Sequence, residues 1–314
     1  MKQFDVTLAG EFNLDLLFYG LPEALPVERE MMAADAVMAL GGSPAITAHN
    51  LAALGNKVGF IAMAAEDAFA EMCMRDLRTA GVDLSKVVQA GFEGRTGITV
   101  LLQHERVRRT LTYPGTTTQL CFEDLDLDYL RASRHFHLSS YFLQTSLQKD
   151  VPRLLALLKE VSVTVSLDTN DDPSGKWDRS LAEVLRHVDV LLPNEIEACR
   201  LAHAENLEDA IARILESVPL VVVKRGAKGA IACTRSHRFE ASAIPTGTVD
   251  AVGAGDSFNA GFLHGYVRGW PLEQCLQSGN AAGAFSVTAS GGVAAFQNPE
   301  MLRGFLSEHS LQVK

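Results

Sequence analysis

The sequence predicts an α/β protein with a doubly wound, mostly parallel sheet flanked by helices and a small β lid. Short apolar runs typical of strands alternate with helix-like segments along the 314 residues, which is the pattern of a parallel sheet covered by helices. No linker rich in proline, glycine or serine divides the chain, so we expect one domain over residues 1–314. Two extended segments interrupt the alternation and predict the lid, near residues 11–20 and 91–115.

The expected strands are apolar or β-branched runs bounded by turn residues. In the main sheet they cover residues 4–9, 57–62, 135–138, 162–167, 189–192 and 220–223. Helical periodicity predicts helices over residues 45–54, 68–79, 147–159 and 207–216, and then over 255–268, 272–289 and 299–308. The lid is expected from residues 14–19 and from a hairpin within residues 97–113.

Composition indicates a large core and argues against several classes of protein. Hydrophobic residues make up 47% of the chain and charged residues 21%, which is too apolar for intrinsic disorder. The net charge of −10 disfavours general binding to nucleic acid. The uncharged stretches 36–56 and 274–299 are long enough to span a membrane, but they contain glycines, serines and amides that suit packing in a soluble fold.

The cysteines and the N-terminus predict a cytoplasmic location with no membrane partner. The five cysteines are widely spaced and form no C-x-x-C pair, so neither a disulfide framework nor a zinc site is expected. Free thiols are typical of a reducing compartment. The first residues lack the apolar run of a signal peptide.

The most informative segment runs from Asp250 to Phe258 with the sequence DAVGAGDSF. Gly253 and Gly255 bracket an alanine just before a long predicted helix, so several backbone N–H groups can point into one small volume. The partial positive charge of a helix N-terminus adds to them, which predicts an anion site. Asp256 at the mouth of this site is either a helix N-cap or a general base, and spacing alone favours the cap.

Two other phosphate-binding loops fit poorly. A dinucleotide fingerprint needs glycine or alanine where Phe258 stands, and Asp256 would face the pyrophosphate. A nicotinamide-dependent dehydrogenase is therefore disfavoured. The chain has no G-x-x-x-x-G-K-[ST] motif, so a Walker-type nucleotidase is excluded.

The segment from Asp250 to Phe258 resembles the C-terminal signature of the ribokinase-like (PfkB) sugar kinases. Further features of that family recur in the right order, so the resemblance covers essentially the whole chain. They are Asn13-Leu14-Asp15, Gly41-Gly42 with Ala48 and Leu54-Gly55, Asn194 with Glu197, and the segment KRGAKG at residues 224–229. The resemblance implies the ribokinase-like fold and ATP-dependent phosphorylation of a sugar hydroxyl.

The resemblance also implies roles in catalysis and nucleotide binding. Asp256 would be the general base, while the backbone of Gly253, Ala254 and Gly255 would hold the transferring phosphoryl group. Asn194 and Glu197 would organise Mg²⁺. ATP would be contacted by Lys224, Gly226, Lys228, Gly229 and Asn280. From the local residues alone, Asn194 and Glu197 could simply start a helix, and residues 224–229 could form an ordinary hairpin turn.

On the substrate side, the resemblance implies sugar contacts from Asn13, Asp15, Gly41 and Gly42. Asn13 and Asp15 share one face if their segment is extended, and a carboxylate suits two neighbouring sugar hydroxyls. The alternative is that Asp15 has only a structural role, in a turn after the first strand.

The chain departs from the family pattern at two substrate positions. Ile46 stands where an asparagine is common, and Asn50, one helical turn later, could partly substitute for it. Gln144 stands where ribokinase has an acidic residue. Asp168-Thr169-Asn170 resembles an element of fructokinase and 2-keto-3-deoxygluconate kinase, but the basic residue usual after it is missing. Arg95, Arg108 and Arg109 of the lid could bind an acidic sugar, although a neutral sugar is favoured.

Two further expectations concern partners. The resemblance implies a K⁺ site at Asp250, with Val252, Ser286, Ala289 and Gly291. A homodimer through the lid is expected, because Leu14, Leu16, Val100 and Leu102 alternate as one apolar face would.

A nucleoside kinase of the same fold and a non-catalytic sugar-binding sensor are the alternative functions.

Overall fold

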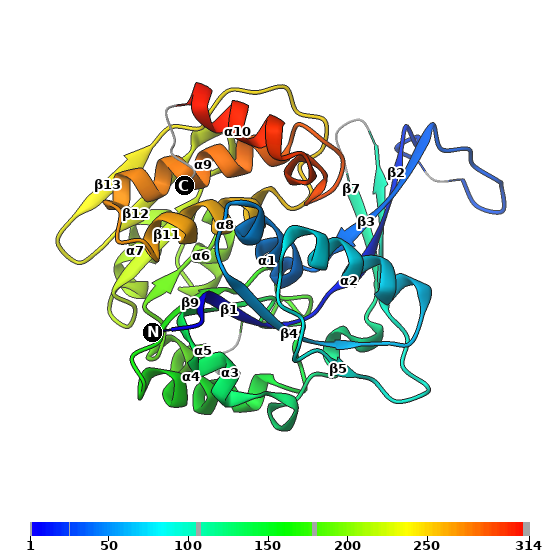
Figure 1. Cartoon of the computed structure of the whole chain (residues 1–314). Coiled ribbons are helices and arrows are strands. Elements are labelled where there is room, and N and C mark those ends of the chain that lie inside the picture. Colours follow the sequence, from blue (N-terminus) through cyan, green and yellow to red (C-terminus); the bar gives the residue numbers. More distant parts are fainter. Residues whose placement is uncertain (1, 25, 105–107, 178–180, 310–314) are drawn as a thin grey trace.

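The computed structural model describes residues 2–24, 26–104, 108–177 and 181–309. A nine-stranded sheet forms its centre, in the order β13-β12-β11-β10-β9-β8-β1-β4-β5 (Figure 1). Every neighbouring pair from β11 to β5 is parallel, and β12 and β13 are added antiparallel. The strands are β1 (Phe4–Gly10), β4 (Val58–Ala64), β5 (Val88–Gln89), β8 (Ser133–Ser139), β9 (Thr164–Asp168), β10 (Val190–Leu191), β11 (Leu220–Lys224), β12 (Ala230–Cys233) and β13 (Arg238–Ala241).

Helices cover both faces of this sheet, so the predicted doubly wound α/β class is confirmed. Alternate residues of a strand enter opposite cores: Leu220 and Val222 of β11 face one core, while Val221 and Val223 face the other. The first face carries α1 (Ser43–Ala53), α2 (Ala68–Ala80), α8 (Ala254–Tyr266), α9 (Leu272–Ser286) and α10 (Pro299–Glu308). The second carries α3 (Leu127–Arg131), α4 (Val151–Lys159), α5 (Leu181–Leu185), α6 (Glu195–Leu201) and α7 (Leu207–Ile214).

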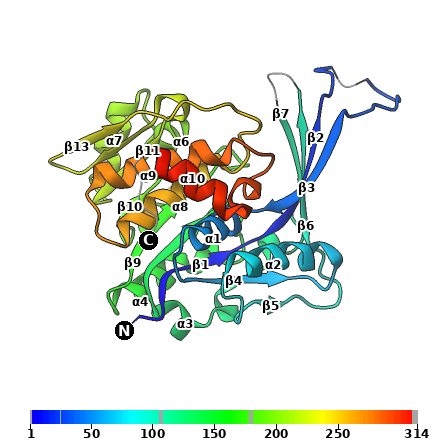
Figure 2. The ribbon, with the colours of Figure 1, turned by 45° about the horizontal axis from the view of Figure 1, so that its top comes forward.

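The lid is a separate four-stranded sheet that projects from one side of the main sheet (Figure 2). Its strands are β3 (Asp35–Gly41), β2 (Asn13–Tyr19), β6 (Gly97–Gln103) and β7 (Arg108–Tyr113), in that order. The sequence pattern predicted β2 and the β6–β7 hairpin but missed β3. Three of the seven residues of β3 are alanine or glycine, Val37 is its one β-branched residue and none is aromatic, so its composition indicates a strand only weakly. Pairing with β2 along its full length holds β3 as a strand despite this composition.

Two predicted boundaries are corrected by backbone geometry. The strand expected from residue 162 begins at Thr164, because Ser162 has a φ of +59°, which is incompatible with extended backbone. The helix expected from residue 147 begins at Val151, after a short 3₁₀ turn at Gln148–Asp150. Among the helices of the described residues, none has both the length and the apolar character that a membrane span requires.

Candidate functional site

The predicted anion turn opens helix α8, and its backbone is tightly constrained. Gly253 is the N-cap residue and has a φ of +72°. A Cβ atom added there would lie 2.4 Å from the Cα atom of Gly292, so only glycine fits. The first N–H groups of a helix have no carbonyl partner within it. In this turn the Ala254 N–H donates to the Ala251 carbonyl at 3.3 Å, so the N–H groups of Gly255 and Asp256 are the ones that remain available to an anion.

Asp256 lies in the first turn of α8 and is buried, with 9% of its surface exposed. Gly253 takes the N-cap position that spacing alone assigned to Asp256. The carboxylate instead accepts a hydrogen bond of 2.5 Å from the Ser43 hydroxyl at the start of α1. Burial, and then the charge of Asp168, raises the pKa of Asp256 to about 7, although the Ser43 bond and Lys224 oppose the rise. A buried carboxylate poised near neutrality is suited to accept a proton.

Lys224, the last residue of β11, brings a positive charge to this turn. Its ammonium pairs with the Asp168 carboxylate at the end of β9 and lies 3.7 Å from where a Cβ atom of Gly255 would be. Asn259 of α8 donates to the same carboxylate at 2.6 Å. Burial would lower the pKa of Lys224, but Asp168 and Glu197 outweigh it and the pKa is raised. Lys224 is therefore a charged group facing the anion turn.

Asn194 and Glu197 form a reciprocal capping box at the start of α6. The Glu197 N–H donates to Asn194 Oδ1 at 2.9 Å, and the Asn194 N–H donates to Glu197 Oε2 at 2.8 Å. The helix-start interpretation is thus realised, and it leaves Glu197 Oε1 outside the box. Burial, and then the charge of Asp168, raises the pKa of Glu197 to about 7. This carboxyl group therefore belongs electrostatically to the same site as Asp256 and Lys224.

The segment predicted to hold nucleotide phosphates is divided between two environments. Gly226–Lys228 is a 3₁₀ turn in the β11–β12 hairpin. This is the ordinary hairpin turn that the local sequence left open as an alternative. Lys228 is largely exposed and lies 3.5 Å from Glu195. Lys224, in contrast, is buried beside Asp168. Asn280 of α9 donates at 3.0 Å to the carbonyls of Ala241, the last residue of β13, and Ser242.

Asn13 and Asp15 share one face of β2, as predicted. The Asn13 amide donates to Asp15 Oδ1 at 2.7 Å, and burial raises the pKa of Asp15 to about 7. A Cβ atom on Gly41 would lie 2.2 Å from Asp15 Oδ1, so this glycine makes room for the carboxylate. Gly42 adopts a φ of +92° against the Glu11 carbonyl.

The lid register separates two neighbouring arginines. Arg108 pairs with Gln103, whereas Arg109 pairs with Leu102 on the opposite face of the sheet. The positive charge of Arg108 offsets part of the rise in the pKa of Asp15 that burial causes. Arg109 donates to the Glu23 carbonyl at 2.8 Å. Of these two predicted arginines, Arg108 is on the side of Asp15 and Arg109 is not.

Two other predicted substrate residues are buried. Asn50 is fully buried and donates to Ser257 Oγ at 2.9 Å and to the Gly292 carbonyl at 3.0 Å. It therefore fastens α1 to α8 instead of facing an open space, which corrects the suggested substitution for Ile46. Gln144 is 2% exposed and donates to the Ser139 carbonyl at 2.8 Å, while its Oε1 has no partner among the described residues.

Sequence reasoning missed Glu11 and Ser43. Glu11 follows β1 and is 3% exposed, and its Oε2 has no hydrogen-bond partner among the described residues. Burial raises its pKa to about 8, and the charge of Asp256 contributes. The available signal was a lone carboxyl residue after an apolar strand. Ser43 gave no local signal, because its contact with Asp256 joins residues 213 positions apart.

The predicted K⁺ ligand set does not fit at Asp250. Each carboxylate oxygen accepts two hydrogen bonds: Oδ1 from Gln103 and the Val252 N–H, and Oδ2 from Tyr19 and the Gly291 N–H. An ionised carboxylate offers about four lone-pair sites, so these donors use its accepting capacity. Ser286 Oγ is buried without a partner among the described residues. Asp250, the only charged residue of the predicted K⁺ ligand set, therefore has no lone pair left for the cation.

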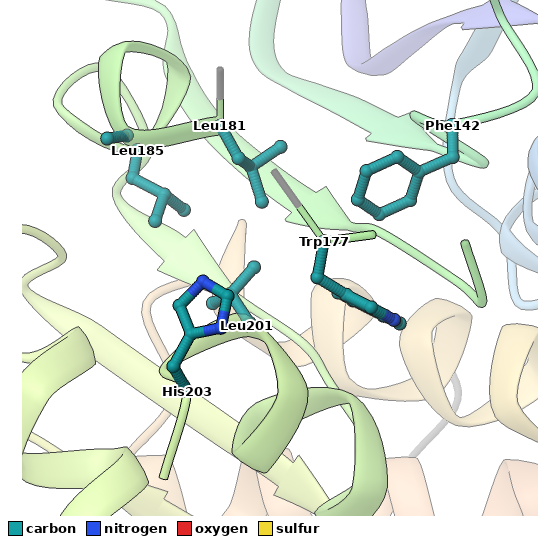
Figure 3. A pocket seen from close by; sticks show the side chains of 7 residues that line it. Phe142, Trp177, Leu181, Leu185, Leu201 and His203 are labelled. Atoms are coloured by element: carbon teal, nitrogen blue, oxygen red, sulfur yellow. The ribbon is translucent and has the colours of Figure 1, made fainter. Parts of the chain in front are cut away.

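No three histidine, cysteine, aspartate or glutamate side chains converge to hold a metal ion within the part of the chain that the structure describes. An apolar cavity of about 180 Å³ lies elsewhere (Figure 3). It is lined by Phe142, Trp177, Leu181, Ala182, Leu185, Leu201 and His203. None of these residues belongs to the cluster around Asp256, so the cavity carries no part of the chemistry described above.

Comparisons with known proteins were made on the whole chain. The family model described as pfkB family carbohydrate kinase matches residues 5–299. An ATP-dependent ribose-1-phosphate kinase of Halopiger xanaduensis is 31% identical over 312 residues, covering 96% of this chain and 98% of its own. A 5-dehydro-2-deoxygluconokinase of Shouchella clausii is 28% identical, covering 91% and 90%. The structure of Arabidopsis thaliana ribokinase with ribose and ATP superposes with a TM-score of 0.81 at 25% identity, covering 96% and 98%.

Proposed function

Since this chain belongs to the pfkB family of carbohydrate kinases, we propose that Asp256 is the base that lets a sugar hydroxyl take the γ-phosphoryl group of ATP. Membership confirms the resemblance inferred from the motifs, and with it the assignment as an ATP-dependent sugar kinase. The single observation that carries the proposal for Asp256 is its position. A buried carboxylate with a pKa near 7 stands in the first turn of α8, beside the Lys224 ammonium.

Each proposed group has a defined task in the transfer. Asp256 Oδ1, oriented by Ser43, accepts the proton of the acceptor hydroxyl. The N–H groups at Gly255 and Asp256 and the Lys224 ammonium stabilise the negative charge on the phosphoryl oxygens. Burial excludes water, so these interactions act at low dielectric. The hydroxyl oxygen then forms the new bond to phosphorus as the bond to ADP breaks.

We assign Mg²⁺ binding to Asp168 and Glu197 through the water shell of the ion. Mg²⁺ retains several waters and prefers carboxylate oxygens, and the Asp168 and Glu197 carboxyl groups lie close enough for the charge of Asp168 to raise the pKa of Glu197. When bound, the ion would neutralise charge on the phosphates of ATP. Gly226, Lys228, Gly229 and Asn280 are proposed to border the nucleotide.

The acceptor side is proposed to bind a neutral polyhydroxylated sugar through Asn13 and Asp15. Their paired amide and carboxyl offer both donors and acceptors on one face of β2. Arg108 stands on that face and is the group that an acidic or phosphorylated sugar would use. Gly41 and Gly42 leave space for the ligand and for Asp15.

The test is an ATP-consumption screen over ketoses, aldoses, keto-deoxy acids, sugar phosphates and nucleosides, with Asp256→Asn as the matched inactive control. We expect turnover with at least one sugar, abolished in the variant. Turnover with nucleosides alone would favour the nucleoside kinase. Sugar binding by calorimetry without any turnover would favour the non-catalytic sensor.

We further propose a cytoplasmic homodimer joined through the outer face of the lid. Met38, Leu16, Val100 and Leu111 form one row across the four strands, and Met38 and Leu111 are 63% and 70% exposed. Such a contiguous apolar row favours burial against a partner. The free cysteines agree with a reducing compartment. Sedimentation of a monomer at micromolar concentration would refute the dimer.

A further inference from the structure

The Asp250 carboxylate joins the lid to the anion turn. Two of its four donors come from the lid: Tyr19 Oη at 3.0 Å from Oδ2 and Gln103 Nε2 at 3.2 Å from Oδ1. The other two are the backbone N–H groups of Val252 and Gly291, each at 3.1 Å. Val252 immediately precedes Gly253, and Gly292, the neighbour of Gly291, packs against Gly253. The carboxylate therefore holds both sides of the anion turn and two lid strands at once.

The lid donors lie on the same face as the proposed sugar-binding residues. Tyr19 follows Asp15 by four positions on β2, so both side chains point to one side. On the same side, Leu17, Ala39 and Leu101 of the lid pack with Val252. Burial raises the pKa of Tyr19 to about 12, so its phenol remains a donor at any working pH. Apolar and polar contacts thus tie the same lid face to the same segment.

We propose that Tyr19 and Gln103 are positioning residues, and that through Asp250 they lock the lid onto the anion turn. The lock couples the acceptor and phosphoryl sites: the lid position that brings Asp15 to the sugar also fixes the turn that faces ATP. In this proposal, hydrogen bonds from the lid to Asp250 fix the anion turn. The K⁺ hypothesis gave that task to a monovalent cation bound at Asp250. This inference rests on the proposed function for its kinetic meaning, whereas the physical link between lid and turn does not.

The physical link is tested by hydrogen exchange of the purified full-length protein followed by mass spectrometry. Tyr19→Phe removes only the phenol hydroxyl, and Gln103→Met keeps the length but removes the amide donor. We expect amides of residues 249–257 to exchange about tenfold faster in each variant. Tyr113→Phe, an exposed tyrosine on the other lid face, should leave exchange unchanged. Wild-type exchange in both lid variants would overturn the proposal, whether or not an acceptor sugar is known.

The kinetic meaning is tested with the acceptor sugar that the screen identifies. Both variants should lower kcat about tenfold and weaken the gain in sugar affinity caused by a non-hydrolysable ATP analogue, with the Kd of the analogue alone unchanged. Failure of every acceptor with the wild type would contradict the proposed function and leave the exchange result standing. Wild-type kcat and coupling in both variants would contradict the lock.

A salt comparison tests what fixes the turn. Wild-type rates at constant ionic strength should be equal in K⁺, Na⁺ and tetramethylammonium, because the Asp250 oxygens already accept four hydrogen bonds. Strong stimulation by K⁺ alone would show that a cation displaces the lid donors, which would overturn the lock.

Discussion

Two glycine-rich turns of this chain resemble each other in sequence but differ in the element that follows each turn and in the charges around it. The turn at Gly253–Gly255 opens the 13-residue helix α8 and packs against Gly292. The turn at Gly226–Gly229 closes a hairpin, and a Cβ atom added at Gly226 would meet nothing within 4 Å. Both contain glycines with positive φ. Glycine spacing thus indicates where the backbone turns, whereas the chemistry of a turn depends on what surrounds it.

Lys224 shows that the position of a residue in the sequence does not decide which of the two turns its side chain lies beside. In sequence it begins the segment of the second turn, two residues before Gly226. In space its ammonium serves the first turn, because the end of β11 lies beside β9 across the short strand β10. The exposed Lys228 stays with the second turn, beside Glu195. The first turn therefore gains a buried fixed charge, and the second keeps a solvated one.

The largest expected effect comes from the carboxylate of the first turn. Asp256→Asn should lower kcat at least ~10²-fold while ATP still binds, since loss of a general base typically costs that much. The raised pKa means that Asp256 is protonated, and inactive as a base, below about pH 7. We therefore expect wild-type kcat/KM to rise with pH through about 7 and the residual rate of the variant to lack that rise. A variant with nearly normal kcat would reduce Asp256 to a structural residue.

The part of the site that is local in sequence could be predicted, and the part that depends on sheet order could not. The turn before α8 follows from adjacent residues, and the strand and helix pattern follows from periodicity. The pairing of Asp168 with Lys224 joins residues 56 positions apart, and it exists only because β9 and β11 flank β10. The choice of Arg108 over Arg109 needs the register of β7, and β3 needs its partner β2. Fold and family are confirmed; the site roles remain predictions.

The second prediction compares the two lysines. Lys224→Met should lower kcat more than tenfold and reduce the free energy of unfolding by about 3–5 kcal/mol, because it leaves Asp168 buried without its counter-charge. Lys228→Met is the matched control for stability and kcat: an exposed charge pair contributes little, so its unfolding and kcat should match the wild type, and any effect of its proposed place beside the nucleotide should be confined to the KM for ATP. Chemical denaturation and steady-state kinetics measure both. Equal effects at the two positions would contradict the assignment of Lys224 to the first turn.

The third prediction compares one glycine with positive φ from each turn, Gly253 and Gly226. Gly253→Ala meets backbone at 2.4 Å and also forces a left-handed alanine, so kcat and Tm should both fall. Gly226→Ala has only the conformational cost, about 1–2 kcal/mol, and should lower Tm by a few degrees with kcat within about twofold of the wild type. Thermal unfolding and initial rates separate these outcomes. A silent Gly253→Ala would show that the anion turn tolerates displacement.

The smallest expected effect distinguishes two glutamates of α6, one for each turn. Glu197 is buried beside Asp168 and Lys224, whereas Glu195 pairs with Arg225 and Lys228 at the surface. Glu197→Gln removes a negative charge near the proposed hydrated Mg²⁺, so the Mg²⁺ concentration for half-maximal rate should rise several-fold at saturating ATP. Glu195→Gln alters the same helix by the same chemical change and should leave the metal titration in place. If both variants shifted it equally, the effect would reflect the general charge of α6, and Glu197 would be only the capping residue of its helix.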